Sequence, residues 1–260
     1  MILSSGTAGF ASAGKTMVPM HIVDEAALPD PTSPHETRAN SVLRPVVFGA
    51  NDGLVSNLAL VMGVAGADPD PAIIVLAGVA GLLAGAFSMG VGEYISVQSQ
   101  RELLDFQVAF QRKQLREVPD QERNILADIY RERGFTRDEA DHFTTRVFAD
   151  PESAVRLLIF EEVGLDERSI GSPWSAAIGS FLSFTLGAAV PLVPYLVTAG
   201  AVAFWFSLGL SLGALGLLGY LISRTTRRDP LYSSARQVVL GGVAAAVTYL
   251  VGSFIGAESA

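Results

Sequence analysis

Long apolar stretches separated by short polar turns dominate the hydrophobic pattern of this chain. The first two occupy residues 44–67 and 71–100, and an acidic turn with two prolines joins them. A helix that crosses a bilayer needs about 20 apolar residues, so both stretches are long enough. Three more apolar stretches follow near the carboxyl end, at residues 173–196, 198–223 and 234–255. The pattern predicts an all-α integral membrane protein with five transmembrane helices.

A polar segment between the second and third apolar stretches predicts a helical insert. Pro119 is placed to start one helix, Thr136 and Glu139 form a capping box for a second, and Gly164 is placed to end a third. Residues 1–40 lack periodicity and are rich in Ser, Thr, Pro and Gly, which predicts a disordered tail. The expected organisation is a tail (1–40), transmembrane helices 1 and 2 (41–100), the insert (101–172) and transmembrane helices 3–5 (173–260).

Arginines near the ends of the apolar stretches predict the orientation in the membrane. They cluster at the ends that five alternating helices would place on one side, and the opposite turns carry no basic residue. Since basic residues favour the cytoplasmic side, the tail and the insert are predicted to be cytoplasmic and the carboxyl terminus external. The residues that decide this are Arg38, Arg44, Arg101, Arg224, Arg227, Arg228 and Arg236.

Composition agrees with a membrane protein and narrows its chemistry. Half of the residues are hydrophobic and the mean hydropathy is +0.39. The chain has no cysteine, so a metal would be held by oxygen, by histidine nitrogen or by methionine sulfur. The net charge of −8 argues against nucleic acid as a partner. The scarcity of lysine, with only two, suggests a bacterial source with a GC-rich genome.

Two carboxylates interrupt the first two apolar stretches. Asp52 lies about two turns into the first stretch and Glu93 in the last third of the second. A charge at that depth costs roughly 2.5–3.5 kcal/mol, so such a residue normally faces a protein interior or a water-filled path. Met89 lies one turn before Glu93, and a thioether beside carboxylates suits a borderline transition metal. The alternative is that Met89 only packs and Glu93 lies at the membrane interface.

Small residues precede Met89 on the same face of the second predicted helix. Gly81 and Gly85 are spaced four residues apart, as helix-packing residues in membranes are. This spacing predicts a close contact with another helix, and we expect the contact to belong to a homodimer.

Several motifs in the chain resemble those of the vacuolar iron transporter family. They are FGANDGLVSN at residues 48–57, SMGVGEYIS at 88–96, IYRERG at 129–134, EEVGLDE at 161–167 and GSPWSAAIGSFLSFTLGAAVPLVPYL at 171–196. The resemblance covers nearly the whole chain after about residue 34. It implies a dimer whose paired helices line a path along which Fe²⁺ or Mn²⁺ leaves the cytoplasm in exchange for protons. It places the path on Asp52, Met89 and Glu93.

The resemblance also implies a metal-binding role for the insert. Four family glutamates would fall at residues 114, 117, 125 and 128, and two methionines near 158 and 159. This chain keeps Glu117 and Asp128, together with Glu162, and lacks the methionines. These three acids are candidates for holding one ion. The alternative, that they are solvated residues on helix faces, stays open.

Two alternative functions are compatible with the sequence. One is a proton-coupled transporter that moves Fe²⁺ or Mn²⁺ out of the cytoplasm, with no permanently bound cofactor. The other is a non-transporting membrane scaffold or metal sensor that kept the fold with a depleted insert. No nucleophile–base pair, nucleotide loop or metal-hydrolase motif is found, so an enzyme is not expected. The expected location is a bacterial plasma membrane, or a vacuolar membrane if the source is eukaryotic.

Overall fold

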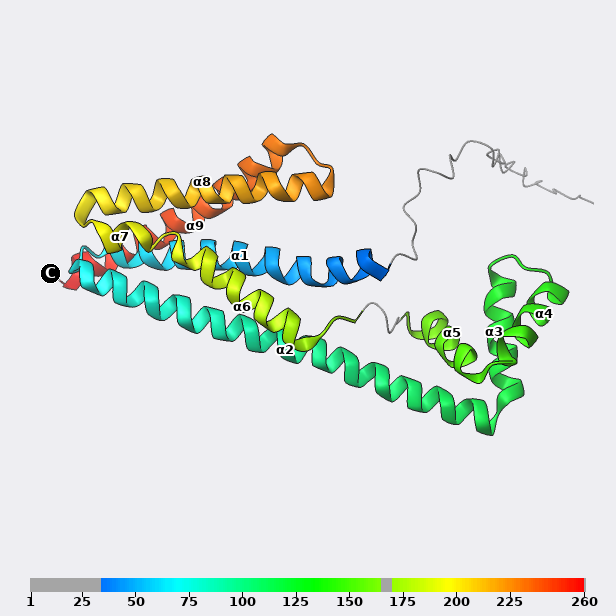
Figure 1. The fold of residues 1–260 in the computed structure, drawn as a ribbon. Coiled ribbons are helices and arrows are strands. Elements are labelled where there is room, and N and C mark those ends of the chain that lie inside the picture. Colours follow the sequence, from blue (N-terminus) through cyan, green and yellow to red (C-terminus); the bar gives the residue numbers. More distant parts are fainter. Residues whose placement is uncertain (1–33, 165–169, 260) are drawn as a thin grey trace, which may run out of the picture. The chain divides into compact units, whose positions relative to one another are not determined.

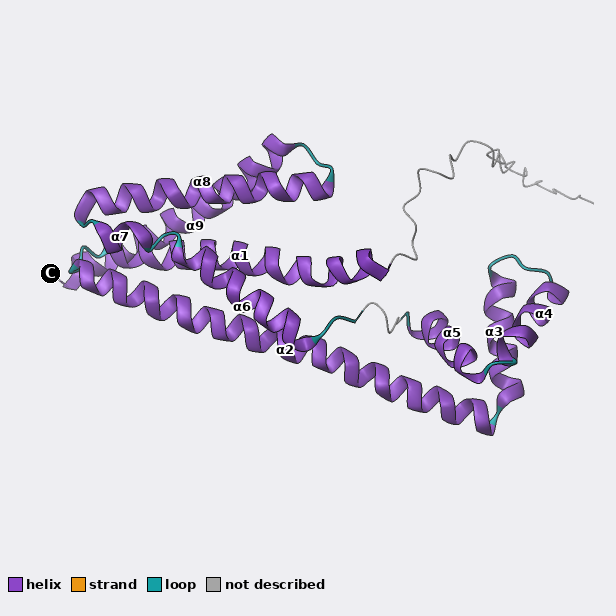
Figure 2. Cartoon of the chain, in the orientation of Figure 1, coloured by secondary structure: helices purple, strands orange, loops and turns teal. Residues whose placement is uncertain are grey.

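The computed structural model describes residues 34–164 and 170–259, with only the backbone at 34–43, 163 and 259. Within these ranges the chain is helical and contains no strand (Figures 1 and 2). The predicted disorder of residues 1–33 lies outside the described residues. The helices are α1 (Pro34–Gly66), α2 (Pro71–Glu117), α3 (Pro119–Glu132), α4 (Arg137–Phe148), α5 (Pro151–Val163), α6 (Pro173–Ala189), α7 (Val193–Val197), α8 (Gly200–Thr226) and α9 (Pro230–Ser259).

The first two helices are both longer than their apolar stretches. Helix α1 begins at Pro34, so residues 34–40, which were assigned to the tail, are helical, and Pro45 lies inside the helix. Helix α2 begins where the Asp70 side chain accepts a hydrogen bond from the Ala72 amide at 2.8 Å. Its 47 residues correspond to about 70 Å at 1.5 Å per residue, roughly twice the thickness of a bilayer core. Its carboxyl-terminal part therefore extends beyond the apolar segment and carries the insert.

Helix α1 packs against α6 through small residues. Gly49 lies against the backbone at Ser180, and Gly53 lies against the backbone at Phe184. Both helices advance by four residues between these contacts, so α1 and α6 run parallel. Because lipid supplies no hydrophobic force between helices, such close backbone contact is a main source of their association.

Helix α9 packs on another face of α1 in the same way. Gly63 faces Thr248, and Gly66 faces Ser253 further along both helices, so α9 also runs parallel to α1. Figure 1 shows α1 lying between α2 and the α8–α9 pair. Helix α1 is thus the central helix of the apolar part.

The predicted third transmembrane helix is not continuous in the structure. It is divided into α6, of 17 residues, and the short α7, with a break at residues 190–192. Pro191 weakens the helix at this point because it has no amide hydrogen to donate. Two side chains satisfy carbonyls near the break: Asn57 donates to Ala188 at 2.6 Å and Ser207 donates to Pro191 at 2.7 Å.

The division of α6 and α7 changes the count of membrane helices. Among the described residues four helices are long and apolar enough to cross a membrane, at Arg44–Gly66 and within α2, α8 and α9. The predicted count of five transmembrane helices is therefore not confirmed, because the third predicted helix is divided at Pro191.

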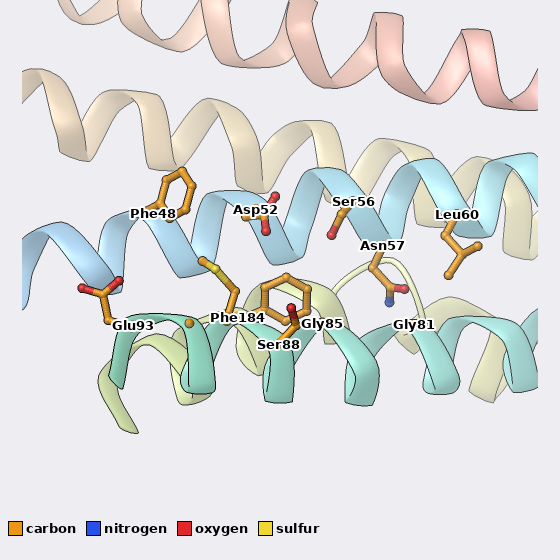
Figure 3. Close-up of a pocket in the computed structure, with 12 residues that line it drawn as sticks. Phe48, Asp52, Ser56, Asn57, Leu60, Gly81, Gly85, Ser88, Glu93 and Phe184 are labelled. Atoms are coloured by element: carbon orange, nitrogen blue, oxygen red, sulfur yellow. The ribbon is translucent and has the colours of Figure 1, made fainter. Parts of the chain in front are cut away.

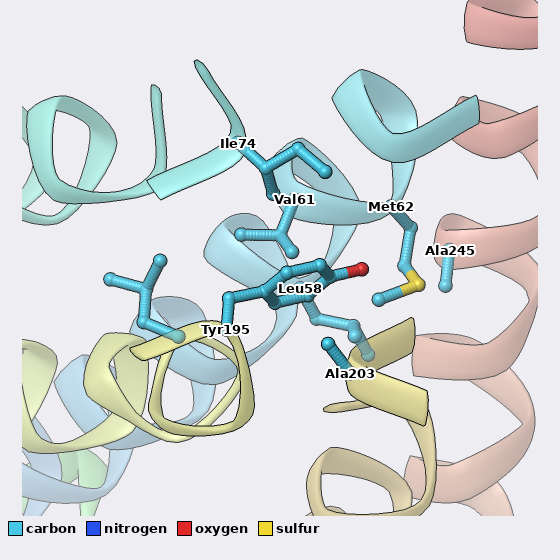
Figure 4. Close-up of a cluster of buried hydrophobic side chains, with 8 residues drawn as sticks. Leu58, Val61, Met62, Ile74, Tyr195, Ala203 and Ala245 are labelled. Carbon is cyan, nitrogen blue, oxygen red and sulfur yellow. The ribbon is translucent and has the colours of Figure 1, made fainter. Parts of the chain in front are cut away.

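A cluster of buried apolar side chains joins the helices near the carboxyl end of α1. Leu58, Val61 and Met62 of α1 contact Ile74 of α2 and Tyr195 of α7 in this cluster (Figure 4). Ala203 of α8 and Ala245 of α9 complete its walls. This cluster fixes the carboxyl end of α1 against the other helices. The break between α6 and α7 lies at the same end.

The insert consists of α3, α4 and α5 packed with the extended part of α2. Val155 and Ile159 of α5 contact Leu104 of α2 in a buried apolar cluster. The predicted helix starts and ends are confirmed: α3 starts at Pro119, and Thr136 and Glu139 form the capping box of α4. Gly164 ends α5 with a φ of 70°, a left-handed conformation that glycine adopts without strain.

Candidate functional site

A pocket of about 490 Å³ lies between α1 and α2, with α6 contributing one wall residue (Figure 3). Its residues recur every three or four positions along each helix, as expected for a helix face. The lining residues are Phe48, Asp52, Ser56, Asn57 and Leu60 from α1, Gly81, Gly85, Ser88, Met89, Gly92 and Glu93 from α2, and Phe184 from α6.

The three path residues predicted from the sequence line this one pocket. Figure 3 shows Asp52 on α1 and Glu93 on α2, on the two facing helices. Met89 lies one turn before Glu93 on the same helix, and all three side chains are partly exposed. The pocket thus contains two carboxylates and one thioether between apolar helices. A thioether beside carboxylates suits a borderline divalent metal such as Fe²⁺.

Asn57 is a pocket residue that the sequence analysis did not single out. Its side chain is buried, with 3% exposed, and its amide nitrogen donates to the Ala188 carbonyl that the α6–α7 break leaves available. Its Oδ1 finds no hydrogen-bond partner in the structure, and a Cβ at Gly81 would lie 3.0 Å from it. The amide oxygen is therefore held toward α2 as a neutral donor atom. The available signal was its position in the motif that also contains Asp52.

The small-residue surface of Gly81 and Gly85 has partners inside the chain. A Cβ at Gly81 would collide with Leu60 of α1, and one at Gly85 would collide with the ring of Phe184 of α6. The close helix contact that their spacing predicted thus occurs within one protomer. These contacts do not require a second copy of the chain.

The structure does not bring the three predicted acids of the insert together. Glu117 lies 3.9 Å from the ammonium group of Lys113, and Asp128 lies 2.9 Å from the guanidinium group of Arg131. Glu162 instead accepts a hydrogen bond from Gln111 at 2.7 Å. Among the described residues, no group of three or more His, Asp or Glu side chains is arranged to hold a metal ion.

Glu162 has a different neighbour, Glu122, that the sequence analysis did not select. Glu122 is buried, with 4% exposed, and its Oε2 has no hydrogen-bond partner in the structure. Burial raises the pKa of this carboxyl above its ordinary value of 4.5, and the charge of Glu162 raises it further. Nothing in the sequence indicated that Glu122, three positions after Pro119, is buried, because its burial arises only when α3 packs on α5.

Glu122→Gln is expected to stabilise the insert at neutral pH. Because the folded-state pKa is raised, the folded state binds the proton more tightly, so stability falls as pH rises above about 4.5. The neutral amide avoids the buried charge, and we expect a gain of about 1 kcal/mol at pH 7.5 that disappears below about pH 4. Amide hydrogen exchange of α3 and α5, measured in detergent with a chelator, reports this change.

Asp128→Asn is the matched control for Glu122→Gln. Asp128 is exposed and its ion pair with Arg131 is of a kind that contributes little, so the change should be under about 0.5 kcal/mol. Equal protection in wild type and Glu122→Gln at pH 7.5 would contradict a destabilising charge at Glu122.

Apolar helices of membrane-spanning length around a pocket with two carboxylates define a multi-pass helical membrane protein. The model of the VIT family matches residues 43–253, so the chain belongs to the VIT family. This match includes the pocket, the α6–α7 break and the insert.

Named relatives agree with this family. The chain is 30% identical to vacuolar iron transporter 2 of Oryza sativa over 85% of this chain and 90% of the relative. It is 27% identical to vacuolar iron transporter 1 of Arabidopsis thaliana, over 86% and 90% of the two chains. A vacuolar iron transporter of Toxoplasma gondii is 28% identical over 85% and 76%. These relatives are eukaryotic, and the bacterial type suggested by the scarcity of lysine is not borne out.

Proposed function

We propose that this protein transports a divalent transition metal, Fe²⁺ or Mn²⁺, out of the cytoplasm through the α1–α2 pocket in exchange for protons. The observation that carries the proposal is the presence of Asp52, Glu93 and Met89 on one pocket between two apolar helices. The names of the relatives, which are vacuolar iron transporters, support iron as the first cargo to test. A vacuolar membrane fits these names.

The cost of burying charge explains why the pocket favours a cation. Two carboxylates among apolar helices are expensive unless a positive partner neutralises them, and a divalent ion does so in one step. The sulfur of Met89 favours a borderline metal over Mg²⁺ or Ca²⁺, which prefer oxygen alone. The fixed oxygen of Asn57 offers a further neutral ligand.

The same two carboxylates provide a route to proton exchange. When the metal leaves, Asp52 and Glu93 are no longer neutralised, and protons are the cations that replace it at least cost. Metal release and proton uptake are then coupled by the charge of one pocket. Outward movement of a metal ion is thereby accompanied by inward movement of protons.

A homodimer supplies the ligands that one protomer lacks. One pocket offers two carboxylates, whereas a transition metal usually has four to six ligands. A second copy related by a two-fold axis would bring its own Asp52, Met89 and Glu93 to the path. The predicted partner is therefore a second copy of this chain, facing the pocket.

The direction of the helices supports a path with the tail and the insert on the cytoplasmic side. Helices α6 and α9 run parallel to α1, as the third and fifth crossings of an alternating chain would. The α6–α7 segment acts as a broken third crossing, a form known at ion-binding sites of transporters. The arginines near these ends then lie on the cytoplasmic side.

Proteoliposome uptake under an imposed pH gradient tests this function. We expect uptake of Fe²⁺ and Mn²⁺, measured with a metal-sensitive dye, and proton movement in the opposite direction. Met89→Leu keeps the apolar volume and removes the sulfur, so it should reduce the Fe²⁺ rate by about three- to tenfold with little loss of stability. Leu60→Ile, on the same pocket, changes side-chain shape without adding or removing a sulfur and is the control for changes of shape alone.

The alternative is a non-transporting membrane scaffold or metal sensor. The insert favours it, because Glu162 is hydrogen-bonded to Gln111 and no group of three acids forms among the described residues. The uptake assay decides between the two. Metal binding without uptake or proton movement, in vesicles of verified orientation, would favour the sensor.

A further inference from the structure

A second pocket, of about 360 Å³, lies among α1, α8 and α9. It is separate from the α1–α2 pocket except that both share Phe48. It lies at the end of the molecule where α8 ends and α9 begins. Its lining residues are Arg44, Val47, Phe48 and Asn51 from α1, Ile222, Thr225 and Thr226 from α8, and Gln237 from α9.

The lining divides into an apolar part and a polar part. Val47, Phe48 and Ile222 offer hydrocarbon surface, whereas Arg44, Gln237 and Thr225 offer hydrogen-bond donors. Asn51 also lines the pocket, and its Oδ1 is buried with no partner in the structure. The pocket therefore matches a ligand with both an apolar chain and a polar head.

Arg44 is the one charged residue that lines this pocket, and the chain segment between its α8 and α9 walls is rich in arginine. Residues 222–237 contain four arginines and one acid, Asp229. The ion pairs formed by the described residues are in the insert and do not include Arg44. Exposed Tyr232 lies in the first turn of α9, at a position typical of tyrosine at a membrane–water interface. The pocket thus carries a positive charge and lies at the depth expected for lipid head groups.

We propose that this pocket binds an anionic phospholipid, with its phosphate at Arg44 and an acyl chain on Val47, Phe48 and Ile222. Charge complementarity selects the head group, because basic pockets between membrane helices bind acidic head groups. The hydrocarbon surface selects a lipid over a soluble phosphate ester, which would leave the apolar lining exposed to water.

Phe48 gives the bound lipid a route to the metal path. The same ring lines both pockets, and Asn51 precedes Asp52 in the chain. A lipid that restrains Phe48 would fix one wall of the α1–α2 pocket. This consequence rests on the proposed transport function, whereas the lipid site itself does not.

Native mass spectrometry of the full-length protein in detergent tests the lipid site. The probes are phosphatidylglycerol and phosphatidylcholine with identical acyl chains, and sn-glycerol 3-phosphate as the free head group. We expect phosphatidylglycerol to bind more tightly than phosphatidylcholine. Arg44→Gln should weaken phosphatidylglycerol binding about fivefold, the factor for one arginine near an anionic surface.

Two further variants make the test specific. Arg228→Gln removes the same charge nearby without touching the pocket and should change binding less than twofold. Thr225→Phe keeps every arginine and fills the space, so it should also weaken phosphatidylglycerol binding, and it serves if Arg44→Gln does not fold.

Three results would overturn the lipid site. Equal binding of the two lipids would remove the charge argument, and equal losses in Arg44→Gln and Arg228→Gln would indicate general attraction rather than a pocket. Competition by sn-glycerol 3-phosphate at the concentration of the lipid would indicate a soluble phosphate ligand. All three are measured without transport, so a failure here is distinct from a failure of the proposed function.

Discussion

Asp52→Asn is expected to abolish metal uptake while the protein still folds and inserts. The amide keeps the shape of the side chain and removes the charge that both metal and proton need. We expect the initial rate of Fe²⁺ uptake to fall more than about 100-fold, because even outer partners of metal ligands cost 10- to 100-fold. The Asp52 side chain is partly exposed to the pocket and the amide has nearly the same size, so unfolding is not expected.

Two controls separate the path from the rest of the molecule. Ser56→Ala changes a pocket residue one turn from Asp52 without changing charge, and should retain most of the uptake. The triple variant Glu117→Gln, Asp128→Asn, Glu162→Gln should raise the metal concentration for half-maximal rate yet leave transport at saturating metal. An active Asp52→Asn with an inactive triple variant would reverse the roles that we assign.

Gly252→Leu is expected to prevent correct packing of α9 on α1. A Cβ at Gly252 would collide with the backbone carbonyl of Gly63, and a backbone atom cannot move aside as a flexible side chain can. The two helices must therefore separate. Overpacking usually costs about 1–3 kcal/mol of stability, and we expect a cost at or above this range in so close a contact. Size-exclusion chromatography of the detergent-solubilised variant should show loss of the monodisperse peak.

Gly209→Leu is the matched control for this packing prediction. Gly209 lies on an exposed face of α8, and a Cβ there would meet nothing within 4 Å. The same substitution should leave the chromatographic peak and thermal stability close to wild type. If both variants behaved alike, the close contact between α1 and α9 would not be a source of stability.

The sequence predicted the helices better than their interruptions. Apolar length together with Pro119, Thr136 and Gly164 was sufficient for most helix positions. The break between α6 and α7 was missed because its Pro191 lies within an otherwise apolar run. Proline alone does not decide between a kink and a break. The outcome depends on partners from other helices, here Asn57 and Ser207, which no local pattern reveals.

The candidate site was likewise predictable only in part, because some of its residues are distinguished by contacts with other helices. Asp52, Met89 and Glu93 stand out because they are polar or soft residues in apolar helices, and the structure places them on one pocket. Asn57 is distinguished by a contact with Ala188, 131 residues away in the chain. In the insert, the resemblance to the family selected Glu117 and Asp128, whereas burial by α5 selects Glu122.

The uninterrupted length of α2 limits how the insert can act on the pocket. Glu93 and Gln111 are 18 residues apart on one continuous helix, which corresponds to about 27 Å. The Debye length at physiological ionic strength is about 8 Å, so the charge of the insert is screened over roughly three such lengths before it reaches the pocket. The insert is thus too far from the pocket for its charge to alter the electrostatic potential there.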